Sequence, residues 1–510
     1  MTTETRDSEQ KYEVRPGVPL PSFDGLPQVA AVSGSEVETL TTEYYDTEDL
    51  RLLRARITLR RREDGTDDGW HLTLPGKPWR AGAASRRELR LPLQRPGDPV
   101  PDELARLVRV HTREAGLRPV ALIETRRRRT TLRDTSGGSL AEILADEVAA
   151  QTFGESTTLS RWNEIELELT GGTPELLRAA GKRLRDGGLR PAGRAAKLER
   201  ALAAKPSPRR AGHRFTRHWP SGEVVLAYLD EQAARLKSLD PAVRRDETDA
   251  VHQMRVTTRR LRSTLQSFPA ILPASATLRL RDELKWLGGL LGDARDTEVL
   301  TEYLRSELAS TPTDLVMGPA QARIVAHYAP REAAARSAVL EALDSPRCFA
   351  MLDELDGLLD DPLVTAAAAE PAGALPAAVA RAWRRTRRRM RRARRTPAGP
   401  ARDVALHETR KAAKRARYAA EAVQPVFGRK ARRFASRMKA VQSILGDHQD
   451  AVNAQRAARE IGVHAHLAGE NAFSFGVLHE RARRDALEYA DQASRAWKRG
   501  ARGKSRKWLN

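Results

Sequence analysis

The pattern of hydrophobic and polar positions changes once along the chain, close to residue 205. Before this point, short segments alternate between polar and apolar residues, and Gly, Pro and Asp separate them. A period of two predicts β-strands whose two faces differ. Residues 164–169 are the sharpest case, because three glutamates share one face while Ile165, Leu167 and Leu169 share the other. We therefore expect residues 1–204 to form an antiparallel sheet with helices.

After residue 217 the apolar positions recur at i, i+3, i+4 and i+7, which is the period of amphipathic helices. Residues 205–216 form a basic segment rich in Pro and Gly, which is typical of a linker. The pattern predicts an α+β chain: a sheet domain at 1–204, the linker at 205–216, an all-α domain at 217–497 and a basic tail at 498–510.

The helical region contains an internal duplication. Residues 252–262 match residues 407–417, with a His, an Arg and further cations at the same places. A Leu-Gly-Asp segment follows each copy, at 291–293 and at 445–447. Two matched pairs in the same order predict a duplicated helical bundle, with repeats at about 217–310 and 375–497.

The cations of each copy share one helical face. They fall at i, i+3, i+7 and i+10, as His252, Arg255, Arg259 and Arg262, and again as His407, Arg410, Lys414 and Arg417. A solvated surface is the commonest role of such a charge run, but its duplication favours a ligand. A capping or packing role for the two histidines stays open. Asp296 and Asp450 are expected to orient an arginine of a neighbouring helix.

The polar strand faces of the first region are almost wholly ionic, cationic on some strands and anionic on others. A closed or strongly curved antiparallel barrel would turn such faces into its lumen, where they need a charged ligand. Arginines bind phosphate oxygens with charge-assisted bonds, and clustered carboxylates imply Mg²⁺ or Mn²⁺. These residue types favour a phosphohydrolase, and a solvated ionic face is the alternative.

The charge balance points to an anionic partner. The chain has 89 Lys and Arg residues against 67 Asp and Glu residues, and its net charge is +22. Such an excess favours nucleic acid, an anionic membrane surface or polyphosphate, although a general bias toward arginine and alanine would also raise it. The single cysteine, Cys348, excludes an intramolecular disulfide framework.

The polar start of the chain lacks the apolar core of a signal peptide, and no run approaches about 18 apolar residues. We therefore expect a cytoplasmic protein with no membrane span.

Residues 381–395 carry ten arginines and no acidic residue. Such a helix repels itself unless anions neutralise it. Trp383 is its one aromatic residue, and the whole chain is only 5% aromatic. Proteins that bind single-stranded nucleic acid usually stack bases on aromatic side chains. A ligand made of phosphate alone is therefore favoured, with nucleic acid as a weaker candidate.

The first region resembles the CYTH domain, a family of triphosphate tunnel enzymes. The resemblance covers about residues 9–203 and is carried by Glu9 and Lys11, by the strand around Arg60 and Arg62, by the three glutamates of 164–168, and by Lys197. It implies an eight-stranded antiparallel tunnel that binds a triphosphate and a divalent metal, Mg²⁺ or Mn²⁺.

By the same resemblance, the phosphate-binding residues are Lys11, Arg60, Arg62, Arg126, Arg128 and Lys197. The implied metal ligands are Glu9, Glu142, Asp146, Glu164 and Glu166. Glu166 and Glu168 are the implied catalytic carboxylates that orient the attacking water. Two positions depart from the family pattern: Asp7 replaces a glutamate, and Thr73 replaces a phosphate-binding lysine. The loss at Thr73 leaves hydrolysis and binding alone both open.

The duplicated segments and their Leu-Gly-Asp partners resemble the CHAD domain over about residues 217–497. This resemblance implies two helical bundles related by a pseudo-twofold axis, with a basic groove or pore that binds inorganic polyphosphate. The expected binding residues are His252, Arg255, Arg259, Arg260, Arg262, Lys285, Arg388, Arg392, His407, Arg410, Lys414, Arg415, Arg417 and Lys439.

The sequence thus predicts a CYTH–CHAD protein that binds polyphosphate or tripolyphosphate, with a metal-dependent inorganic triphosphatase in its first domain. The alternative is a non-catalytic polyanion-binding scaffold, for polyphosphate granules or nucleic acid.

Overall fold

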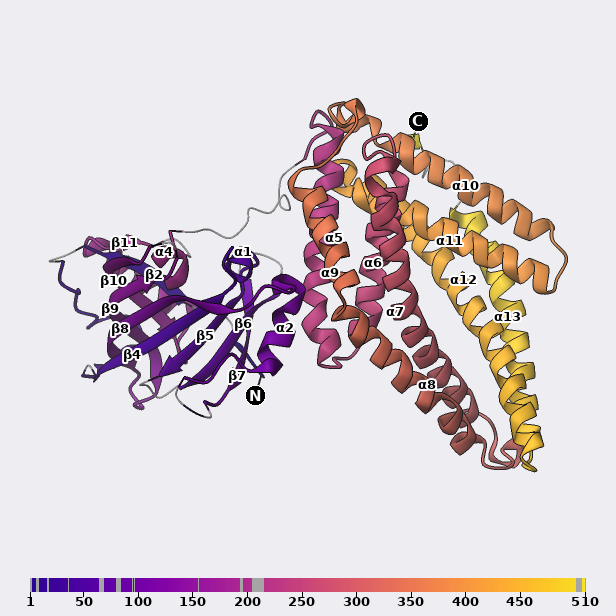
Figure 1. Cartoon of the computed structure of the whole chain (residues 1–510), viewed down its shortest axis with the longest axis horizontal. Helices are drawn as coiled ribbons and strands as arrows, with labels where there is room; N and C mark the ends of the chain where they lie inside the picture. The colour runs from indigo at the N-terminus through magenta and orange to yellow at the C-terminus, as the bar shows by residue number, and fades with distance from the viewer. Residues whose placement is uncertain are drawn as a thin grey trace. The chain divides into compact units, whose positions relative to one another are not determined.

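A computed structural model describes residues 2–509 except 6–8, 16–17, 35, 64–67, 79–83, 94, 96, 155, 193–195, 204–214 and 501–506. The chain divides into two compact units, Met1–Pro208 and Arg209–Asn510. The first is built on an antiparallel sheet and the second is all helical (Figure 1), so the predicted α+β class is confirmed. Most of the predicted linker, and the predicted tail from 501 to 506, lie outside the described residues.

The sheet has eleven described strands rather than the predicted eight. They are β1 (Thr2–Thr5), β2 (Glu9–Val14), β3 (Ala31–Val32), β4 (Glu36–Asp46), β5 (Thr58–Glu63), β6 (Gly69–Pro78), β7 (Ala84–Leu91), β8 (Arg118–Arg133), β9 (Ser139–Thr152), β10 (Thr158–Leu169) and β11 (Arg190–Pro191). The spatial order is β1-β7-β6-β5-β4-β8-β9-β10-β2-β11, and β3 pairs with β8.

The sheet is not closed, because no pairing among the described residues joins its end strands β1 and β11. The predicted closed tunnel is therefore wrong for this structure. The prediction missed β3 and β11 because strands of two residues carry no alternation that a sequence could show.

One predicted strand begins later than expected. Residues 54–62 alternate between polar and apolar side chains, which predicts a strand, but the chain first forms α1 (Arg51–Arg54), and β5 begins at Thr58. The buried carboxylate of Asp46 explains this helix, since it accepts hydrogen bonds from the backbone N–H groups of Leu52 and Leu53 at 2.8 and 2.9 Å. A side chain that satisfies these free donors stabilises a helix start that the strand pattern conceals.

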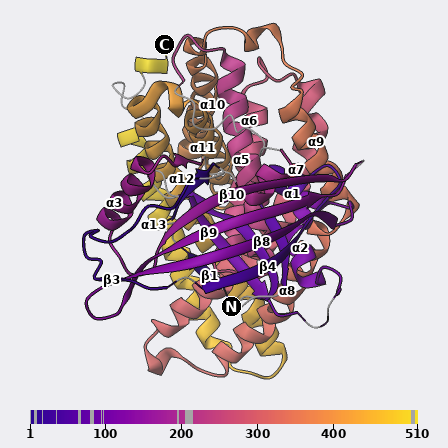
Figure 2. The same cartoon turned by 90° about the vertical axis from the view of Figure 1, so that its left-hand side faces the viewer.

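Two helices cover the apolar face of the sheet. The helix α2 (Asp102–Thr112) packs on an apolar cluster that includes Leu59, Trp70 and Leu72. The helix α3 (Pro174–Asp186) packs on one that includes Ile165 and Leu167. Alternating residues point to opposite faces. Asp146 of β9, Glu164 and Glu166 of β10 and Arg127 of β8 therefore lie on the other face, which we call the ionic face; the three strands run side by side in Figure 2.

The second unit contains nine long described helices. They are α5 (Ser221–Arg244), α6 (Ala250–Ser267), α7 (Ala274–Ala309), α8 (Ala320–Leu343), α9 (Pro346–Asp360), α10 (Pro376–Arg395), α11 (Pro400–Ala422), α12 (Gln424–Leu467) and α13 (Phe473–Gly500). The short helices η1 (Thr313–Leu315), η2 (Ala366–Ala368), η3 (Ala372–Ala374) and η5 (Lys507–Leu509) lie between or after them, and α4 (Lys197–Ala201) belongs to the first unit.

The duplication is visible as two runs of four helices, α5–α8 and α10–α13. In both runs the second helix packs on the third and the third on the fourth. The first repeat therefore includes α8, whereas the predicted boundary at about 310 left this helix out. The two runs meet where α6 contacts α11 and α7 contacts α12. Among the described helices, none is long and apolar enough to cross a membrane.

Candidate functional site

Three buried carboxylates lie together on the ionic face of the sheet. Asp146 comes from β9, and Glu164 and Glu166 come from β10, where two residues of spacing turn them to the same face. In the antiparallel register Glu164 lies opposite Asp146. One oxygen of each carboxylate lies within 4.8 Å of the others. We call Asp146, Glu164 and Glu166 the carboxylate cluster.

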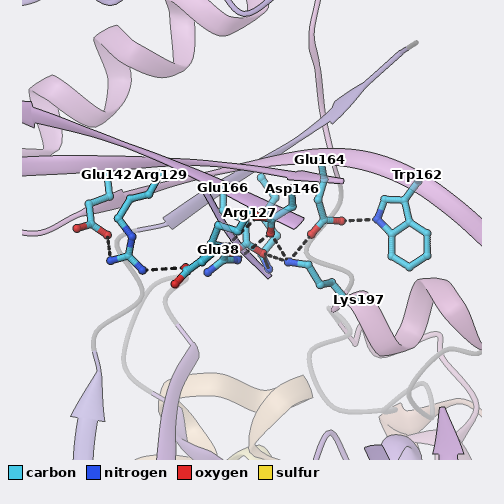
Figure 3. Close-up of polar contacts among 10 residues, drawn as sticks. Glu38, Arg127, Arg129, Glu142, Asp146, Trp162, Glu164, Glu166 and Lys197 are labelled. Carbon is cyan, nitrogen blue, oxygen red and sulfur yellow. Dashed lines mark hydrogen bonds and ion pairs between the residues drawn. The ribbon is translucent and has the colours of Figure 1, made fainter. Parts of the chain in front are cut away.

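The ammonium group of Lys197 lies at the centre of this cluster (Figure 3). Its Nζ atom is 2.8 Å from Asp146 Oδ2, 2.8 Å from Glu164 Oε1 and 2.9 Å from Glu166 Oε1. The next residue, Leu198, is buried in an apolar cluster that includes Trp162, and this anchors α4 over the ionic face. A single cation therefore contacts all three acids, as a metal ion would.

Two further cations approach the cluster from neighbouring strands. Lys11 on β2 donates to Glu166 Oε1 at 2.6 Å. Arg127 on β8 donates to both oxygens of Asp146, at 2.8 and 2.7 Å, and to Glu166 Oε2 at 3.1 Å. The bidentate contact is the strong form of an arginine–carboxylate pair. The structure thus brings together Lys11, Lys197 and the three predicted acids.

The predicted phosphate contacts Arg126 and Arg128 lie on the opposite side of β8. Arg126 is 63% exposed and pairs with the exposed Glu147, whereas Arg127 is only 14% exposed. Arg128 is also exposed. The prediction was wrong by one residue, because four successive arginines, 126–129, give no alternation from which to choose the inward pair. Arg127 and Arg129 are the inward residues, since Arg127 lies opposite Asp146 in the register.

Each charged group of this cluster stabilises the ionised form of its neighbours. Burial opposes the ionisation of Glu166, but the charges of Lys197, Lys11 and Arg127 outweigh it and hold the pKa of Glu166 well below its usual range. Burial also disfavours the charged form of Lys197, yet the carboxylates of Glu166, Asp146 and Glu164 raise its pKa. Glu166 is therefore ionised, and Lys197 protonated, at neutral pH.

The remaining predicted acids lie along the same face. Glu142 accepts a hydrogen bond from Arg129 at 3.3 Å, and Arg129 also donates to Glu38 at 3.1 Å, so Glu142 is held outside the carboxylate cluster. Glu168 lies opposite Glu142 in the register. The side chain of Glu9, and Asp7 altogether, lie outside the described residues.

A second ionic group lies on β5, β6 and β7. Arg60 donates to Glu88 at 3.1 Å, and His71 Nδ1 is 3.2 Å from the same carboxylate oxygen. Burial opposes ionisation of Glu88, but the hydrogen bond from His71 and the charge of Arg60 keep its pKa low. Thr73 lies opposite Glu88 in the register, and Arg62 shares the face of Arg60 two residues further on. The acid Glu88 therefore lies beside Thr73, the position that departs from the lysine of the family pattern.

The carboxylate cluster suits a hard divalent cation. Mg²⁺ and Mn²⁺ prefer oxygen ligands, and all three donors here are carboxylate oxygens. All three carboxylates already contact the positive charge of Lys197. The donor set therefore fits the predicted metal.

The helical unit contains a cavity of about 620 Å³ between its two repeats. We call it the inter-repeat cavity. Its walls come from α6, α7, α11 and α12, and eight of the residues predicted to bind polyphosphate line it: His252, Arg255, Arg259, Arg262, His407, Arg410, Lys414 and Arg415. The structure therefore brings the two copies of the duplicated segment together around one space.

Two of the predicted residues, Arg260 and Arg417, do not line the cavity. Both pair with Glu421, at 3.1 and 2.7 Å. Four other predicted residues are exposed and do not line the cavity, namely Lys285, Lys439, Arg388 and Arg392. Helical spacing alone does not separate these cations, because their ion-pair partner decides which of them is neutralised: Glu421 lies one turn from Arg417 on α11 and on a different helix from Arg260.

The Leu-Gly-Asp segments have a structural role that the sequence did not reveal. A Cβ atom at Gly446 would lie 3.0 Å from a guanidinium nitrogen of Arg410, and one at Gly292 would lie 3.6 Å from Arg255. Gly446 therefore lets Arg410 lie close against α12, whereas a side chain at Gly292 would make only an ordinary contact with Arg255. Arg255 also donates to Asp296 at 2.7 Å, as expected for an acid that orients an arginine.

Like charges crowd together in the inter-repeat cavity. Lys414 is partly buried, and burial together with the charges of Arg410, Arg259 and Arg255 lowers its pKa well below the ordinary value. Burial also lowers the pKa values of Arg259 and Arg410. Within the described part of the chain, no carboxylate forms an ion pair with Lys414. The cavity thus holds a cationic group that lacks a matching anion.

Sequence reasoning missed several residues of both sites. On the sheet these are Arg127, Arg129, Glu38 and Glu88, and in the cavity they include Arg295, Lys411, Tyr418 and Gln449. Gln449 could have been predicted from the sequence, because it lies between Asp447 and Asp450 in the second Leu-Gly-Asp segment.

Two domain families match this chain in comparisons to known proteins, in the order that the sequence predicts. The CYTH domain family matches residues 9–191, and the CHAD domain family matches residues 227–459. Two proteins of Mycobacterium tuberculosis, both named as uncharacterized, are 36% identical to this chain over 486 residues, which cover 93% of it and 92% of each relative. The chain is a tandem of a CYTH and a CHAD domain. It belongs to the CYTH–CHAD family.

Two solved structures are also similar to part of this chain. PptA from Streptomyces chartreusis is 25% identical, with a TM-score of 0.48, and the match covers 55% of this chain and 99% of that one. The CHAD domain from the plant Ricinus communis is 24% identical, with a TM-score of 0.45, over 57% of this chain and 95% of that one.

Proposed function

We propose that this protein binds inorganic polyphosphate in the inter-repeat cavity, and that the ionic face of its sheet binds a triphosphate or chain end with Mg²⁺ or Mn²⁺ and hydrolyses it. The observation that carries the proposal is Lys414, a partly buried lysine among Arg255, Arg259 and Arg410 with no acid paired to it. An anion bound among these cations would offset the unfavourable energy of burying like charges together.

The chemistry of the cavity favours phosphate over a nucleic acid base. Of the residues that line it, only Tyr303 and Tyr418 are aromatic apart from the two histidines. Tyr418 is buried, and the guanidinium groups of Arg260 and Arg417 lie over its ring at 5.7 and 5.4 Å, so it has little surface for stacking a base. A chain of phosphates needs charge and donors alone, which the cavity supplies.

The arginines of α10 extend this cationic surface. Its buried face consists of residues such as Trp383, Thr386 and Met390, so the arginines are left outside. On the flank toward α11, Arg389 is 4.0 Å from Glu408, and Arg385 is near enough to Arg415 of the cavity to contribute to the lowered pKa of that residue. Arg388 and Arg392 belong to the same exposed surface. We assign α10 to the binding of phosphates beyond the cavity.

On the sheet, Lys11, Arg127 and Lys197 are positioned to hold the oxygens of a terminal phosphate, alongside Arg60 and Arg62. A divalent ion held by Asp146, Glu164 and Glu166 would supply positive charge that polarises this phosphate for attack by water. Glu166 and Glu168 are the proposed catalytic carboxylates. Glu168 lies two residues beyond Glu166 on the same face of β10, and we assign it to orienting the water. The cations then stabilise the charge that develops in the transition state.

A non-catalytic scaffold is the second candidate function, and one observation favours it. Thr73 supplies no cation, and the adjacent Glu88 pairs with Arg60, which reduces the positive charge available to a phosphate on these strands. In that case the sheet would bind a triphosphate without cutting it.

The hydrolysis proposal predicts metal-dependent release of phosphate from tripolyphosphate. The full chain should release phosphate with Mg²⁺ or Mn²⁺ and none after chelation of the metal. Glu166→Gln removes a charge from the carboxylate cluster and should slow release by about 100-fold or more. A colorimetric phosphate assay measures both effects.

The matched control is Glu147→Gln, since Glu147 is 61% exposed on the other side of β9, next to Asp146. It should release phosphate at the rate of the unchanged chain. If the unchanged chain releases no more phosphate than Glu166→Gln while still binding tripolyphosphate, the scaffold function replaces the enzyme.

The cavity proposal predicts different effects for two equivalent glycines. Gly446→Ala forces the guanidinium of Arg410 to move, so it should weaken tripolyphosphate binding several-fold, whereas Gly292→Ala makes only an ordinary contact with Arg255 and should leave affinity unchanged. Both changes favour helix by about 0.5–1 kcal/mol, so neither should unfold the chain. Isothermal titration calorimetry measures the affinities, and equal affinities for both variants would count against Arg410 as a ligand.

The role of α10 predicts a dependence on chain length. Arg381, Arg385 and Arg392 share the flank toward Arg389, and Arg387, Arg391 and Arg394 share the other flank. Changing either set of three arginines to glutamine removes the same number of positive charges. The first triple variant should weaken binding of long-chain polyphosphate and leave tripolyphosphate binding unchanged, and the second should have a smaller effect.

Competition binding with a labelled long-chain polyphosphate separates these cases. Equal losses in both triple variants would reduce α10 to a general electrostatic effect. Displacement of the label by single-stranded DNA at equal phosphate concentration would contradict the preference for polyphosphate.

A further inference from the structure

Far from the duplicated motifs in sequence, two helices of the bundle bring together two imidazoles and a carboxylate. His327 lies on α8, and Glu460 and His464 lie one helical turn apart on α12. One ligand atom of each lies within 4.8 Å of the others. Because α8 belongs to the first repeat and α12 to the second, the group spans the contact between the repeats.

The helices that carry these residues are held by a common core. Ile324 and Tyr328 of α8 are buried in the same apolar cluster as Ile461 of α12. The side chain of His327 is only 9% exposed, and its ring packs edge-on against Tyr328 with the centroids 4.8 Å apart. One ligand is therefore fixed in orientation, whereas Glu460 and His464 are exposed and can adjust.

The neighbouring Arg331 shows where the imidazole of His327 directs its lone pair. Arg331 contacts His327 Nε2, and it also pairs with Glu460 Oε1 at 3.2 Å. A guanidinium can only donate hydrogen bonds, so Nε2 of His327 is the acceptor and carries no proton. This lone pair, the Glu460 oxygen and a positive charge already meet at one point.

We propose that His327, Glu460 and His464 form a binding site for a divalent transition-metal ion such as Zn²⁺ or Co²⁺, which replaces Arg331. Imidazole nitrogens select such ions over Mg²⁺, so this site differs in kind from the all-oxygen carboxylate cluster. Bonds of about 2.0–2.2 Å require the ligand atoms to approach to about 3.3 Å. The two exposed side chains supply that movement, and water completes the coordination.

A metal held this way links the two repeats through α8 and α12. The ion binds the folded bundle and not the separated helices, so its binding free energy adds to the stability of the repeat contact. The site needs neither phosphate binding nor hydrolysis, and it stands whether or not those proposals hold.

The test is a titration of the full chain, without a polyhistidine tag, with Co²⁺ in the presence of excess Mg²⁺ to occupy the carboxylate cluster. Visible absorption of the bound Co²⁺ reports nitrogen ligation. His327→Ala and His464→Ala should each weaken binding about tenfold or more. Arg331→Ala removes the competing cation and should strengthen binding. His479→Ala, on α13 beside Gln455 and outside this group, should bind like the unchanged chain.

The two opposite effects protect the test against simple unfolding, since a damaged fold cannot strengthen binding. The proposal is overturned if the unchanged chain binds no Co²⁺ at about 100 μM, or if the His327 and Arg331 variants bind it equally well. Co²⁺ should also raise the thermal unfolding midpoint of the unchanged chain and not that of His327→Ala.

Discussion

The main constraint on the helical unit is the repulsion between like charges where α6 and α11 cross, which the rest of the unit must overcome. Packing the two repeats together brings Arg255, Arg259, Arg410 and Lys414 around one cavity. Burial raises the free energy of each charge, and each cation raises that of its neighbours. Asp296 offsets part of this through Arg255, but among the described residues no carboxylate forms an ion pair with Lys414. The buried apolar faces of the helices hold the repeats together against this repulsion, and a phosphate chain would remove it.

On the sheet it is carboxylates that are buried together, and lysine and arginine side chains neutralise them. Its buried carboxylates are neutralised by Lys11, Lys197 and Arg127, so the ionic face is complete without a ligand. Breaking such a buried network by removing one partner typically costs about 3–5 kcal/mol. Asp146, Glu164 and Glu166 would hold the proposed divalent ion, which would compete with Lys197 for these carboxylates.

The sequence was sufficient where a pattern has one interpretation and insufficient where partners decide. The alternation of 164–169 placed Glu164 and Glu166 correctly, and the duplicated segments placed both histidines at one cavity. The run of arginines at 126–129 gave no alternation, so only the pairing of β8 with β9 shows that Arg127 faces Asp146. Arg260 and Arg417 share helical faces with cavity residues, yet Glu421 on the same helix as Arg417 draws both away. The open edge of the sheet depends on long-range pairing, which local periodicity does not encode.

Scanning calorimetry of the full chain with tripolyphosphate tests the charge imbalance of the cavity most directly. A ligand that binds only the folded state stabilises it by about 2.7 kcal/mol at 100 times its Kd, which raises the unfolding midpoint by several degrees. Tripolyphosphate should raise the midpoint of the helical unit, and sodium chloride at the same ionic strength should raise it far less. The same midpoint in both solutions would contradict the claim that the cavity is built to be completed by phosphate.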